Sequence, residues 1–422
     1  MEVRAGYKQT AAGVIPEDWR LSSMGDEAEL LTGFPFQSSG FTKSGVRLLR
    51  GSNVKRGAVD WSTEITQHWP AVETKTQAYG LRAGDLVIAM DGALVGRSYA
   101  TIAASDLPAL LVQRVARLRS KKSVQGLLRA WVASEFFVQH VDLVKTHTAI
   151  PHISPKDIRQ FALVVPSATA EQIAIADALS DVDALFTGLD RLIAKKRDIK
   201  KAAMQQLLTG QTRLPGFHGV WGATTLRQAV TTPITDGPHL TPRFLATGVP
   251  FLSVNNLVNH RLDFSSLRYI SMEDHIEFSK KCRPKRGDIL FGKAASVGMV
   301  ALVETDMELN IWSPLALIRV TGRMHERYVF FALQTLQIAR QIKLMTNASS
   351  QGNMGMSDIG MLEIPLPSLS EQAAIANVLS DMDAELAALE ARRDKTRALK
   401  QGMMQELLTG KTRLVKPEAA HV

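Results

Sequence analysis

The sequence is poor in cysteine, because its 422 residues include only one, Cys282. A single cysteine cannot form a disulfide within the chain, and it excludes a zinc site built on several cysteines. A chain without disulfides suits a reducing compartment, so we expect a cytoplasmic protein. For Cys282 itself we expect a solvated or half-buried thiol with no reactive role.

Long hydrophobic segments are also missing. No stretch of the sequence approaches the roughly 18 apolar residues that are needed to span a bilayer. The N-terminal segment MEVRAGYKQTAAGVIPEDW lacks the apolar centre of a signal peptide. The sequence therefore predicts a soluble protein that is not secreted.

Signatures of catalysis are the third absence. The GKT tripeptide at 410–412 resembles part of a phosphate-binding loop, but Gln405 stands where that loop needs a glycine. His239 follows Asp236 closely, yet no HExxH motif or other set of metal ligands accompanies the pair, and a turn is the simpler interpretation. We find no motif for S-adenosylmethionine binding, amino-methyl transfer or DNA cleavage. The sequence thus predicts a binding protein with no cofactor or metal of its own, although a divergent self-contained nuclease and a protein-binding scaffold stay open as alternatives.

The charge balance favours a polyanionic partner. The chain has 50 lysines and arginines against 41 aspartates and glutamates, which gives a net charge of +9. Basic side chains that contact phosphates release condensed counterions, so a basic protein is suited to nucleic acid. Hydrophobic residues make up 45% of the chain and charged residues 22%, which is ordinary for a folded protein.

An internal repeat organises the chain. Residues 171–214 (EQIAIADALSDVDALFTGLDRLIAKKRDIKKAAMQQLLTGQTRL) align without a gap with residues 371–414, and about half of the positions are identical. A weaker likeness relates 45–49 to 248–252 and 82–86 to 285–289. We therefore divide the chain into a first variable module at 1–166, a repeated segment at 167–214, a second variable module at 215–366, a second repeated segment at 367–414 and a tail at 415–422.

Both repeated segments have the apolar spacing of long helices that end at Gly210 and Gly410. A helix of about 38 residues is about 57 Å long, and its narrow stripe needs a partner. We expect the two helices to pack antiparallel on each other, with breaks in the stripe at Lys196 and at 392–396, and Ile199 and Leu399 continuing it. Packing of each helix on its own module alone is the alternative. The stripe residues are Ile175, Leu179, Val182, Phe186, Leu189 and Ile193 in the first helix, and Ile375, Leu379, Met382, Leu386, Leu389 and Leu407 in the second.

The two variable modules have a mixed α/β pattern. Short apolar runs at 86–89 and 289–291 predict strands, each directly after a Gly-Asp turn. Residues 127–144 and 328–344 predict helices. Each module is large enough for a core of its own.

Loops that are rich in polar and basic residues separate these elements. Arginine, asparagine, glutamine and serine side chains suit base edges, while lysines and backbone amides suit phosphates, so we predict DNA contacts there. For any single residue a plain turn role is the alternative. The candidates are Phe36, Gln37, Ser38, Arg50, Asn53, Arg97, Lys145, His147 and Thr148 in the first module, and Asp236, His239, Asn255, Asn256, Lys293, Ser296, Ser350, Gln351 and Asn353 in the second.

The layout resembles the specificity subunits of type I restriction–modification systems. The resemblance rests on the EQ..IA..LSD start and the LLTGxTRL finish of both repeated segments, and on the IPEDW sequence at 15–19. It covers nearly the whole chain. The helical motifs are specific, and the IPEDW motif is looser in the second copy, around 214–221.

The resemblance implies an α+β fold in which two α/β target-recognition domains alternate with two long antiparallel helices, a coiled-coil spacer within a pseudo-two-fold internal repeat. It also implies that each domain reads one half of a bipartite, asymmetric DNA target, while the helices set the unread spacer and dock two modification subunits. Those partners would carry S-adenosylmethionine and methylate adenine. Two restriction subunits, with ATP and magnesium, would complete the complex, and this chain would catalyse nothing.

Overall fold

The computed structural model describes residues 4–347 and 353–415. The described chain divides into two compact units, each an α+β arrangement. Unit 1 holds the residues up to Asp190 and those from Arg392 onward, and unit 2 holds Arg191–Ala391. Each unit therefore combines one variable module with part of both repeated segments.

The two long helices are α5 (Thr169–Leu208) and α11 (Leu369–Leu408), of 40 residues each. Gly210 and Gly410 follow their last turns with φ of 72° and 71°, the left-handed conformation that glycine adopts without strain. The predicted ends of the helices are therefore confirmed.

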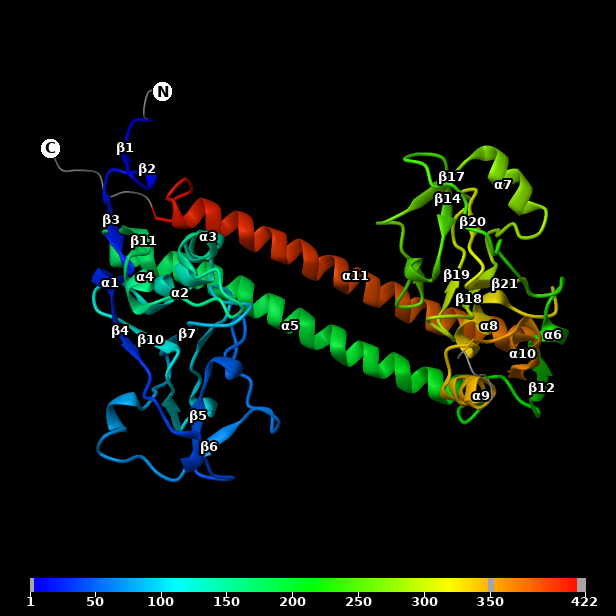
Figure 1. Cartoon of the computed structure of the whole chain (residues 1–422), viewed down its shortest axis with the longest axis horizontal. Helices are drawn as coiled ribbons and strands as arrows, with labels where there is room; N and C mark the ends of the chain where they lie inside the picture. Colours follow the sequence, from blue (N-terminus) through cyan, green and yellow to red (C-terminus); the bar gives the residue numbers. More distant parts are fainter. Residues whose placement is uncertain (1–3, 348–352, 416–422) are drawn as a thin grey trace. The chain divides into compact units, whose positions relative to one another are not determined.

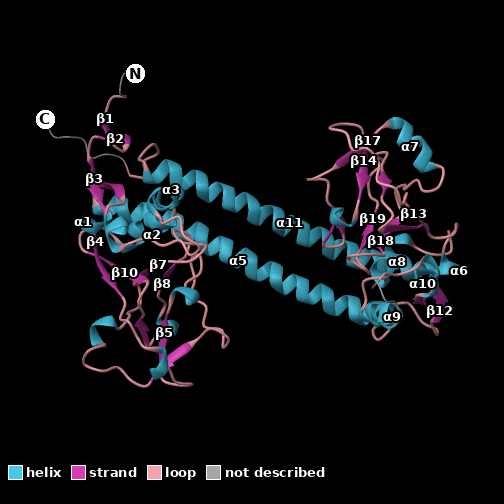
Figure 2. Ribbon diagram, viewed as in Figure 1, coloured by secondary structure: helices cyan, strands magenta, loops and turns pink. Residues whose placement is uncertain are grey.

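Unit 1 contains two sheets, two strand pairs and short helices, joined by long loops (Figure 2). One sheet has the order β4-β10-β7-β8 and the other β6-β5-β9; β11 pairs with β3, and β1 with β2. The bounds of the strands are β1 Tyr7–Thr10, β2 Gly13–Pro16, β3 Trp19–Ser23, β4 Ala28–Thr32, β5 Val46–Leu49, β6 Gln67–Trp69, β7 Leu86–Ala89, β8 Tyr99–Thr101, β9 Ala109–Leu111, β10 Val115–Ser120 and β11 Ala162–Pro166. The helices are α1 Met24–Glu27, α2 Gln125–Ala133, α3 Glu135–Val144 and α4 Pro155–Arg159, with 3₁₀ turns η1 Ser38–Gly40, η2 Gly51–Asn53, η3 Gln77–Tyr79 and η4 Ala104–Asp106.

Unit 2 repeats the two sheets and the β3–β11 pairing of unit 1, and it has a further strand pair, β15 with β16. Its sheets have the orders β13-β21-β18-β19 and β17-β14-β20, and β12 pairs with β22 as β3 pairs with β11. The bounds of the strands are β12 Gly222–Thr225, β13 Thr235–Asp236, β14 Val249–Leu252, β15 Leu257–Val258, β16 Arg261–Leu262, β17 Arg268–Ile270, β18 Ile289–Gly292, β19 Val300–Leu302, β20 Asn310–Ile311, β21 Leu315–Ile318 and β22 Glu363–Leu366. The helices are α6 Leu226–Ala229, α7 Met272–Ser279, α8 Glu326–Ala332, α9 Leu336–Asn347 and α10 Met356–Met361, with the 3₁₀ turn η5 Val254–Asn256.

The single helix that we predicted near the end of each module is a pair of helices. In unit 1 the break between α2 and α3 falls at Ser134, whose hydroxyl donates to Trp131 O at 2.6 Å and accepts from Phe137 N at 3.4 Å. In unit 2 the hydroxyl of Thr335 makes the same two contacts, to Ala332 O at 2.8 Å and from Ile338 N at 3.4 Å, between α8 and α9. A hydroxyl that caps a new helix start in this way competes with continuation of the old helix.

Segments of α5 and α11 lie side by side and antiparallel in each unit (Figure 1). In unit 1 Lys400 of α11 pairs with Asp183 of α5. In unit 2 Lys200 of α5 lies 2.6 Å from Asp383 of α11, which is the same contact with the two helices exchanged. The predicted antiparallel packing of the helices is confirmed within each unit.

The start of one helix and the end of the other enter the main core of each unit. Unit 1 buries Ile175 and Leu179 of α5 with Leu407 of α11, and unit 2 buries Ile375 and Leu379 of α11 with the end of α5. Burying an aliphatic side chain of this size stabilises the fold by about 1.5–3 kcal/mol. Neither helix packs on a single module alone.

The middle of the helix pair departs from the predicted stripe. Leu189 and Ile193 are buried, while Val182, Phe186, Met382 and Leu389 are half-buried. Ile199 and Leu399, which we expected to continue the stripe, are 43% and 58% exposed. Thr396, which we expected to break it, is buried, and its hydroxyl donates to Arg392 O at 2.8 Å. The central contacts thus include ion pairs and a threonine, which a search for apolar spacing overlooks.

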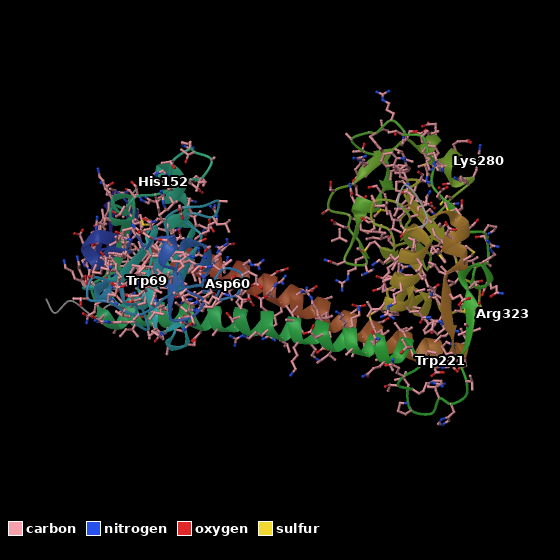
Figure 3. The ribbon with its side chains drawn as sticks, turned by 60° about the horizontal axis from the view of Figure 1, so that its bottom comes forward. Asp60, Trp69, His152, Trp221, Lys280 and Arg323 are labelled. Atoms are coloured by element: carbon pink, nitrogen blue, oxygen red, sulfur yellow. The ribbon has the colours of Figure 1, made fainter. Side chains whose placement is uncertain are left out.

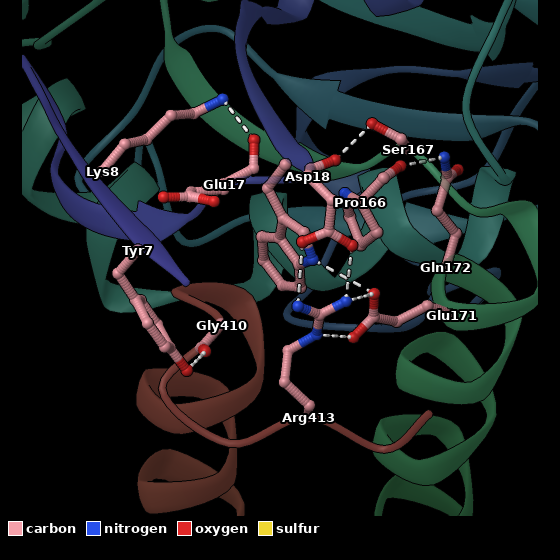
Figure 4. A network of polar contacts seen from close by, with 11 residues as sticks. Tyr7, Lys8, Glu17, Asp18, Pro166, Ser167, Glu171, Gln172, Gly410 and Arg413 are labelled. Carbon is pink, nitrogen blue, oxygen red and sulfur yellow. Dashed lines mark hydrogen bonds and ion pairs between the residues drawn. The ribbon is translucent and has the colours of Figure 1, made fainter. Parts of the chain in front are cut away.

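In unit 1 a network of polar contacts joins the segment after α11 to the N-terminal strands and to the start of α5 (Figure 4). Arg413, just after α11, donates to both oxygens of Asp18 at 2.9 and 2.8 Å and also binds Glu171 at the start of α5. Trp19 Nε1 donates to Glu171 at 3.1 Å, and Tyr7 donates to Gly410 O at 3.0 Å. Three segments that are distant in sequence therefore meet at one guanidinium.

Unit 2 repeats part of this network. Arg213 binds Glu371 at the start of α11 with one contact of 2.7 Å, and Trp221 Nε1 donates to the same carboxylate at 3.0 Å. The remaining donors of Arg213 go to the backbone carbonyls of His218 and Gly219. No second carboxylate is bonded to Arg213 among the described residues, so this network stays more local.

Candidate nucleic-acid interface

Both units bring the same two loops together. In unit 1 the amide of Ile153 donates to Met90 O at 2.9 Å, so the loop after β7 meets the loop before α4. In unit 2 the amide of Met354 donates to Lys293 O at 2.9 Å, and the loop after β18 meets the loop before α10. We call each of these meeting points a loop pair. Several predicted contact residues of each module fall on its loop pair.

In unit 1 the loop pair gathers Arg97, Lys145, His147 and Thr148. Lys145 Nζ lies 2.6 Å and Arg97 Nη2 lies 3.3 Å from the carboxylate of Asp142, at the end of α3. The hydrogen bond from Lys145, helped by Arg97, lowers the pKa of Asp142 and outweighs its burial. His147 and Thr148 are exposed beside them. The arrangement presents cationic and hydroxyl donors to an acceptor-rich ligand.

The loop at 146–152 is held by its own side chains. Thr146 Oγ1 lies 2.9 Å from His152 Nδ1 and 3.1 Å from Thr148 Oγ1. His152 lies at the edge of unit 1 in Figure 3. We did not single out Thr146 and His152 as anchors of this loop, because no sequence motif marks two side chains that bond to each other across a turn.

In unit 2 the loop pair lies beside a charged cluster around Asp236. The carboxylate of Asp236 is buried, with 4% of the residue exposed. It accepts from Lys293 Nζ at 2.9 Å, lies 3.1 Å from His239 Nε2 and is also bonded by Lys281. Burial alone would raise the pKa of Asp236, but the hydrogen bonds from Lys281 and Lys293 outweigh it and hold the pKa below its usual range. The carboxylate is therefore ionised and fixes two ammonium groups in place.

Lys281 is a member of this cluster that the sequence analysis missed. It follows α7, at a distance of 45 residues from Asp236 in the sequence, and no motif joins the two. Only the pairing of β13 with β21 and the position of α7 bring them together. The pair of lysines at 280 and 281 after a helix was the only signal available.

Three predicted contact residues have structural roles instead. Asn53 and Asn256 are buried in equivalent 3₁₀ turns, where their amides donate to Asp60 O at 2.9 Å and to Asp263 O at 3.1 Å. Their oxygens accept from backbone amides of the same turns, so these amide groups have their partners inside the fold. Phe36 is buried against Trp69, with ring centroids 4.9 Å apart. These side chains are not presented to a ligand.

The other predicted residues that the structure describes differ in their exposure. Arg50 is half-buried and donates to Ile65 O. Gln37 and Ser38 lie at η1, away from the loop pair in the sequence and the sheet order. Ser350 and Gln351 lie outside the described residues. Gln37, Ser38, Asn255, Ser296 and Asn353 are exposed.

Metal and thiol chemistry find little support in the described part of the chain. Across 4–347 and 353–415, no three histidine, cysteine, aspartate or glutamate side chains are grouped so that they could hold a metal ion. Over the same ranges, none of the helices has the length and apolar character that crossing a membrane requires. Burial raises the pKa of the Cys282 thiol to about 12, so this thiol is protonated at neutral pH.

Comparisons with known proteins give a consistent family. The family model of the type I restriction modification DNA specificity domain matches residues 244–397. The EcoAI specificity subunit of Escherichia coli is 32% identical over 46% of this chain, although that match spans only 32% of the subunit's own length. The EcoBI specificity subunit of Escherichia coli is 23% identical over 93% of this chain and 85% of its own length. The family model and both relatives point to type I restriction–modification specificity subunits, which agrees with the resemblance that the sequence carries.

The fold agrees with this family. The crystal structure of the type I system S subunit from M. genitalium superposes with a TM-score of 0.62 at 13% identity, over 97% of this chain and 98% of that one. A chain from a structural study of complex assembly and conformational transition of the type I R-M system gives a TM-score of 0.54 at 16% identity, over 94% of this chain and 99% of that one. The relatives are named as specificity subunits, which agrees with the expectation that catalysis belongs to other subunits. The predicted fold class is confirmed, and the matches support the predicted family.

Proposed function

We propose that this chain selects the DNA sequence on which a type I restriction–modification complex acts, with each variable module reading one half of a bipartite, asymmetric target. The observation that carries the proposal is the loop pair, because both units build it on equivalent backbone contacts and line it with different side chains. A shared scaffold with unlike contact groups suits two unlike half-sites. Residues 1–166 and 215–366 are the proposed target-recognition domains.

Within this proposal the exposed and half-buried loop residues make the DNA contacts. Lys145, Arg97 and His147 in the first domain and Lys293, His239 and Asn353 in the second lie on or beside the loop pairs. Gln37, Ser38, Thr148, Asn255 and Ser296 are exposed, and they are candidates for further contacts. Cations at these places would neutralise phosphates or bond base edges, and the polar groups would bond base edges.

The helices α5 and α11 are the proposed spacer and docking element. Half-sites that are one turn of DNA apart are about 34 Å from centre to centre, and a helix of 40 residues is about 60 Å long. We propose that the helices set the unread distance between half-sites and dock two modification subunits. Inserting a few residues at matched places in both helices should change the spacer that the complex tolerates, whereas a change in the bases read would contradict this division of roles.

The chemistry belongs to the partners in this proposal. This chain needs no cofactor of its own, while the modification subunits bring S-adenosylmethionine and two restriction subunits, where present, bring ATP and magnesium. The complex works in the cytoplasm.

The test is to purify the chain with its modification subunit and to measure binding to random and genomic duplexes across a range of salt concentrations. We expect sequence-selective binding, adenine methylation within the selected sites, and an affinity that falls as salt rises. Absence of both selective binding and methylation would overturn the proposal. DNA cleavage by the chain alone would favour a nuclease, and protein binding without any DNA binding would favour a scaffold.

A further inference from the structure

Unit 2 is charged at a place where unit 1, with the same backbone, is uncharged. Asp236 pairs with Ala316 across β13 and β21, as Thr32 pairs with Ala116 across β4 and β10. The glycine after each of them has no room for a side chain, since a Cβ on Gly237 or Gly33 would meet a backbone oxygen within 2.2 Å. Thr32 and Asp236 therefore occupy equivalent places.

The second member of the pair is equivalent as well. Lys293 N donates to Pro314 O and Lys293 O accepts from Met354 N, both at 2.9 Å. Met90 makes the same two contacts, with Arg114 at 2.8 Å and Ile153 at 2.9 Å. The Asp236–Lys293 ion pair of unit 2 thus replaces Thr32 and Met90 of unit 1.

The fold does not require these charges. Unit 1 builds the same contacts with a half-buried threonine and a buried methionine. A buried carboxylate loses its hydration, and its partners must compensate for that loss, so replacing such a pair with neutral residues is often neutral or stabilising. The charges therefore need a reason other than folding, and a ligand supplies one.

The cluster offers donors to such a ligand. An ammonium group has three N–H donors. The ammonium of Lys281 donates to two acceptors, the carboxylate of Asp236 and, at 3.3 Å, Gly237 O. Two ammonium groups face one carboxylate, so the cluster keeps a net positive charge at neutral pH. The side chain of Lys281 is 52% exposed and that of Lys293 is 16% exposed. Asp236 holds both in fixed positions, so little side-chain entropy is lost on binding.

DNA has two acceptors that suit ammonium groups held in fixed positions. One is a phosphate, and the other is the major-groove edge of guanine. The phosphate backbone is the same in both half-sites, yet unit 1 has the uncharged Thr32 and Met90 where unit 2 has Asp236 and Lys293. A contact that only one half-site requires points to a base. Resting on the function proposed above, we propose that Lys281 and Lys293, positioned by Asp236, bond O6 and N7 of a guanine in the half-site read by unit 2.

The experiment gives unit 2 the chemistry of unit 1. The variant Asp236→Thr/Lys293→Met copies the residues that unit 1 already accommodates at equivalent backbone positions, and Lys281→Gln removes the more exposed ammonium alone. Each variant is purified in complex with the modification subunit, and selected duplexes are sequenced from a randomised pool. We expect the preference for guanine at one position of one half-site to fall roughly 10- to 100-fold. The other half-site and the spacer should stay unchanged.

Two controls separate base contact from other roles. Lys280→Met changes the neighbouring lysine, which pairs with Glu277 and is labelled in Figure 3, and it should leave the selected sequence unchanged. Lys281→Arg keeps donors at the site and should retain the guanine. If the double variant does not fold, as judged by its melting temperature, Lys281→Gln and Lys281→Arg still decide the matter.

The outcomes are distinct. Equal weakening on all duplexes with a smaller salt dependence would identify a phosphate contact and overturn the inference, as would an unchanged selected sequence. Absence of selectivity in the unaltered complex would instead overturn the proposed function. Selectivity in the unaltered complex without a guanine that depends on Lys281 would sink this inference alone.

Discussion

The two units share the backbone contacts of their sheets and loop pairs. They differ in the polar network around Arg413 or Arg213 and in the side chains of their loops. In unit 1 a single guanidinium, that of Arg413, joins Asp18 and Glu171, which lie far from it in the sequence. In unit 2 the equivalent Arg213 bonds one carboxylate and two nearby carbonyls. The difference teaches that the repeated segments preserve the packing geometry, while residues outside them are free to diverge around it.

The largest effect is expected when each of the two arginines, Arg413 and Arg213, is replaced by methionine. Arg413→Met leaves Glu171 buried without its cation and frees Asp18, so we expect a loss of about 3–5 kcal/mol in the free energy of unfolding of unit 1. Arg213→Met should destabilise unit 2 by less, because that arginine bonds one carboxylate only. Urea unfolding, followed by hydrogen exchange of each unit, measures both. Equal losses would contradict the contrast drawn between the two networks.

Matched core residues should instead respond alike. Leu179 in α5 and Leu379 in α11 are 2% and 0% exposed in the cores of units 1 and 2. Replacing either by alanine should lower the free energy of unfolding by about 2–5 kcal/mol, because a cavity is left in a packed core. The exposed Leu399→Ala serves as the control and should cost under about 0.5 kcal/mol. Thermal and urea unfolding of the three variants would show whether the helix starts are equivalent.

The ends of α1 and α6 should respond differently to acid, because α1 ends in the ionisable Glu27 and α6 ends in Ala229. The stability that Glu27 gives to unit 1 should therefore depend on pH. Burial alone would raise the pKa of Glu27, but hydrogen bonds from Arg20, Ser123 and Ser22 outweigh it and lower the pKa from 4.5 to about 2. A group with a depressed pKa stabilises the fold above its unfolded pKa and loses that contribution as the pH falls through its folded pKa. Here the window runs from about 4.5 down to about 2.

Glu27→Gln should therefore lower the stability of unit 1 near neutral pH by a free energy on the order of 3 kcal/mol. The difference from the unaltered protein should shrink through that window and vanish near pH 2. Unfolding curves of both proteins at a series of pH values measure this. A difference that is independent of pH would mean that the ionised carboxylate is not what stabilises unit 1.

The smallest effect concerns the ion pairs along the helices. Lys196 lies 2.6 Å from Glu385 in unit 2, and both side chains are partly exposed. The equivalent positions in the other copy are Thr396 and Leu185, which form no ion pair. Lys196→Met should cost only about 0.2–1 kcal/mol, and less at high salt. A larger loss that is insensitive to salt would show that this lysine packs the helices rather than pairing charges.

Sequence reasoning succeeded where the duplication or a strong local rule applied. The ends of both helices were predictable, because Gly210 and Gly410 stand at matched places and glycine accepts the positive φ that ends a helix. The burial of Leu189 and Ile193 followed from their spacing. The prediction that Ile199 and Leu399 continue the apolar stripe was wrong. Ion pairs and the buried Thr396 occupy the middle of the helix pair, and a search for apolar spacing does not detect them.

The candidate site was less predictable. Residue type marked Lys293 and Asp236, and the structure brings them together. Residue type also marked Asn53 and Asn256, but turns that are formed by tertiary packing bury both. Lys281 joins the cluster only through the placement of α7, which local sequence does not encode. The sequence pattern therefore did not predict the contacts between distant segments that form the site.

The account depends most on two unlike modules reading two unlike half-sites, and the methylation pattern of DNA in cells tests that most directly. Genomic adenine methylation would be sequenced in matched strains with and without the gene, under identical growth. The account predicts one gene-dependent motif with two different specific halves and an unread spacer of constant length. A single uninterrupted motif, or two identical halves, would contradict it.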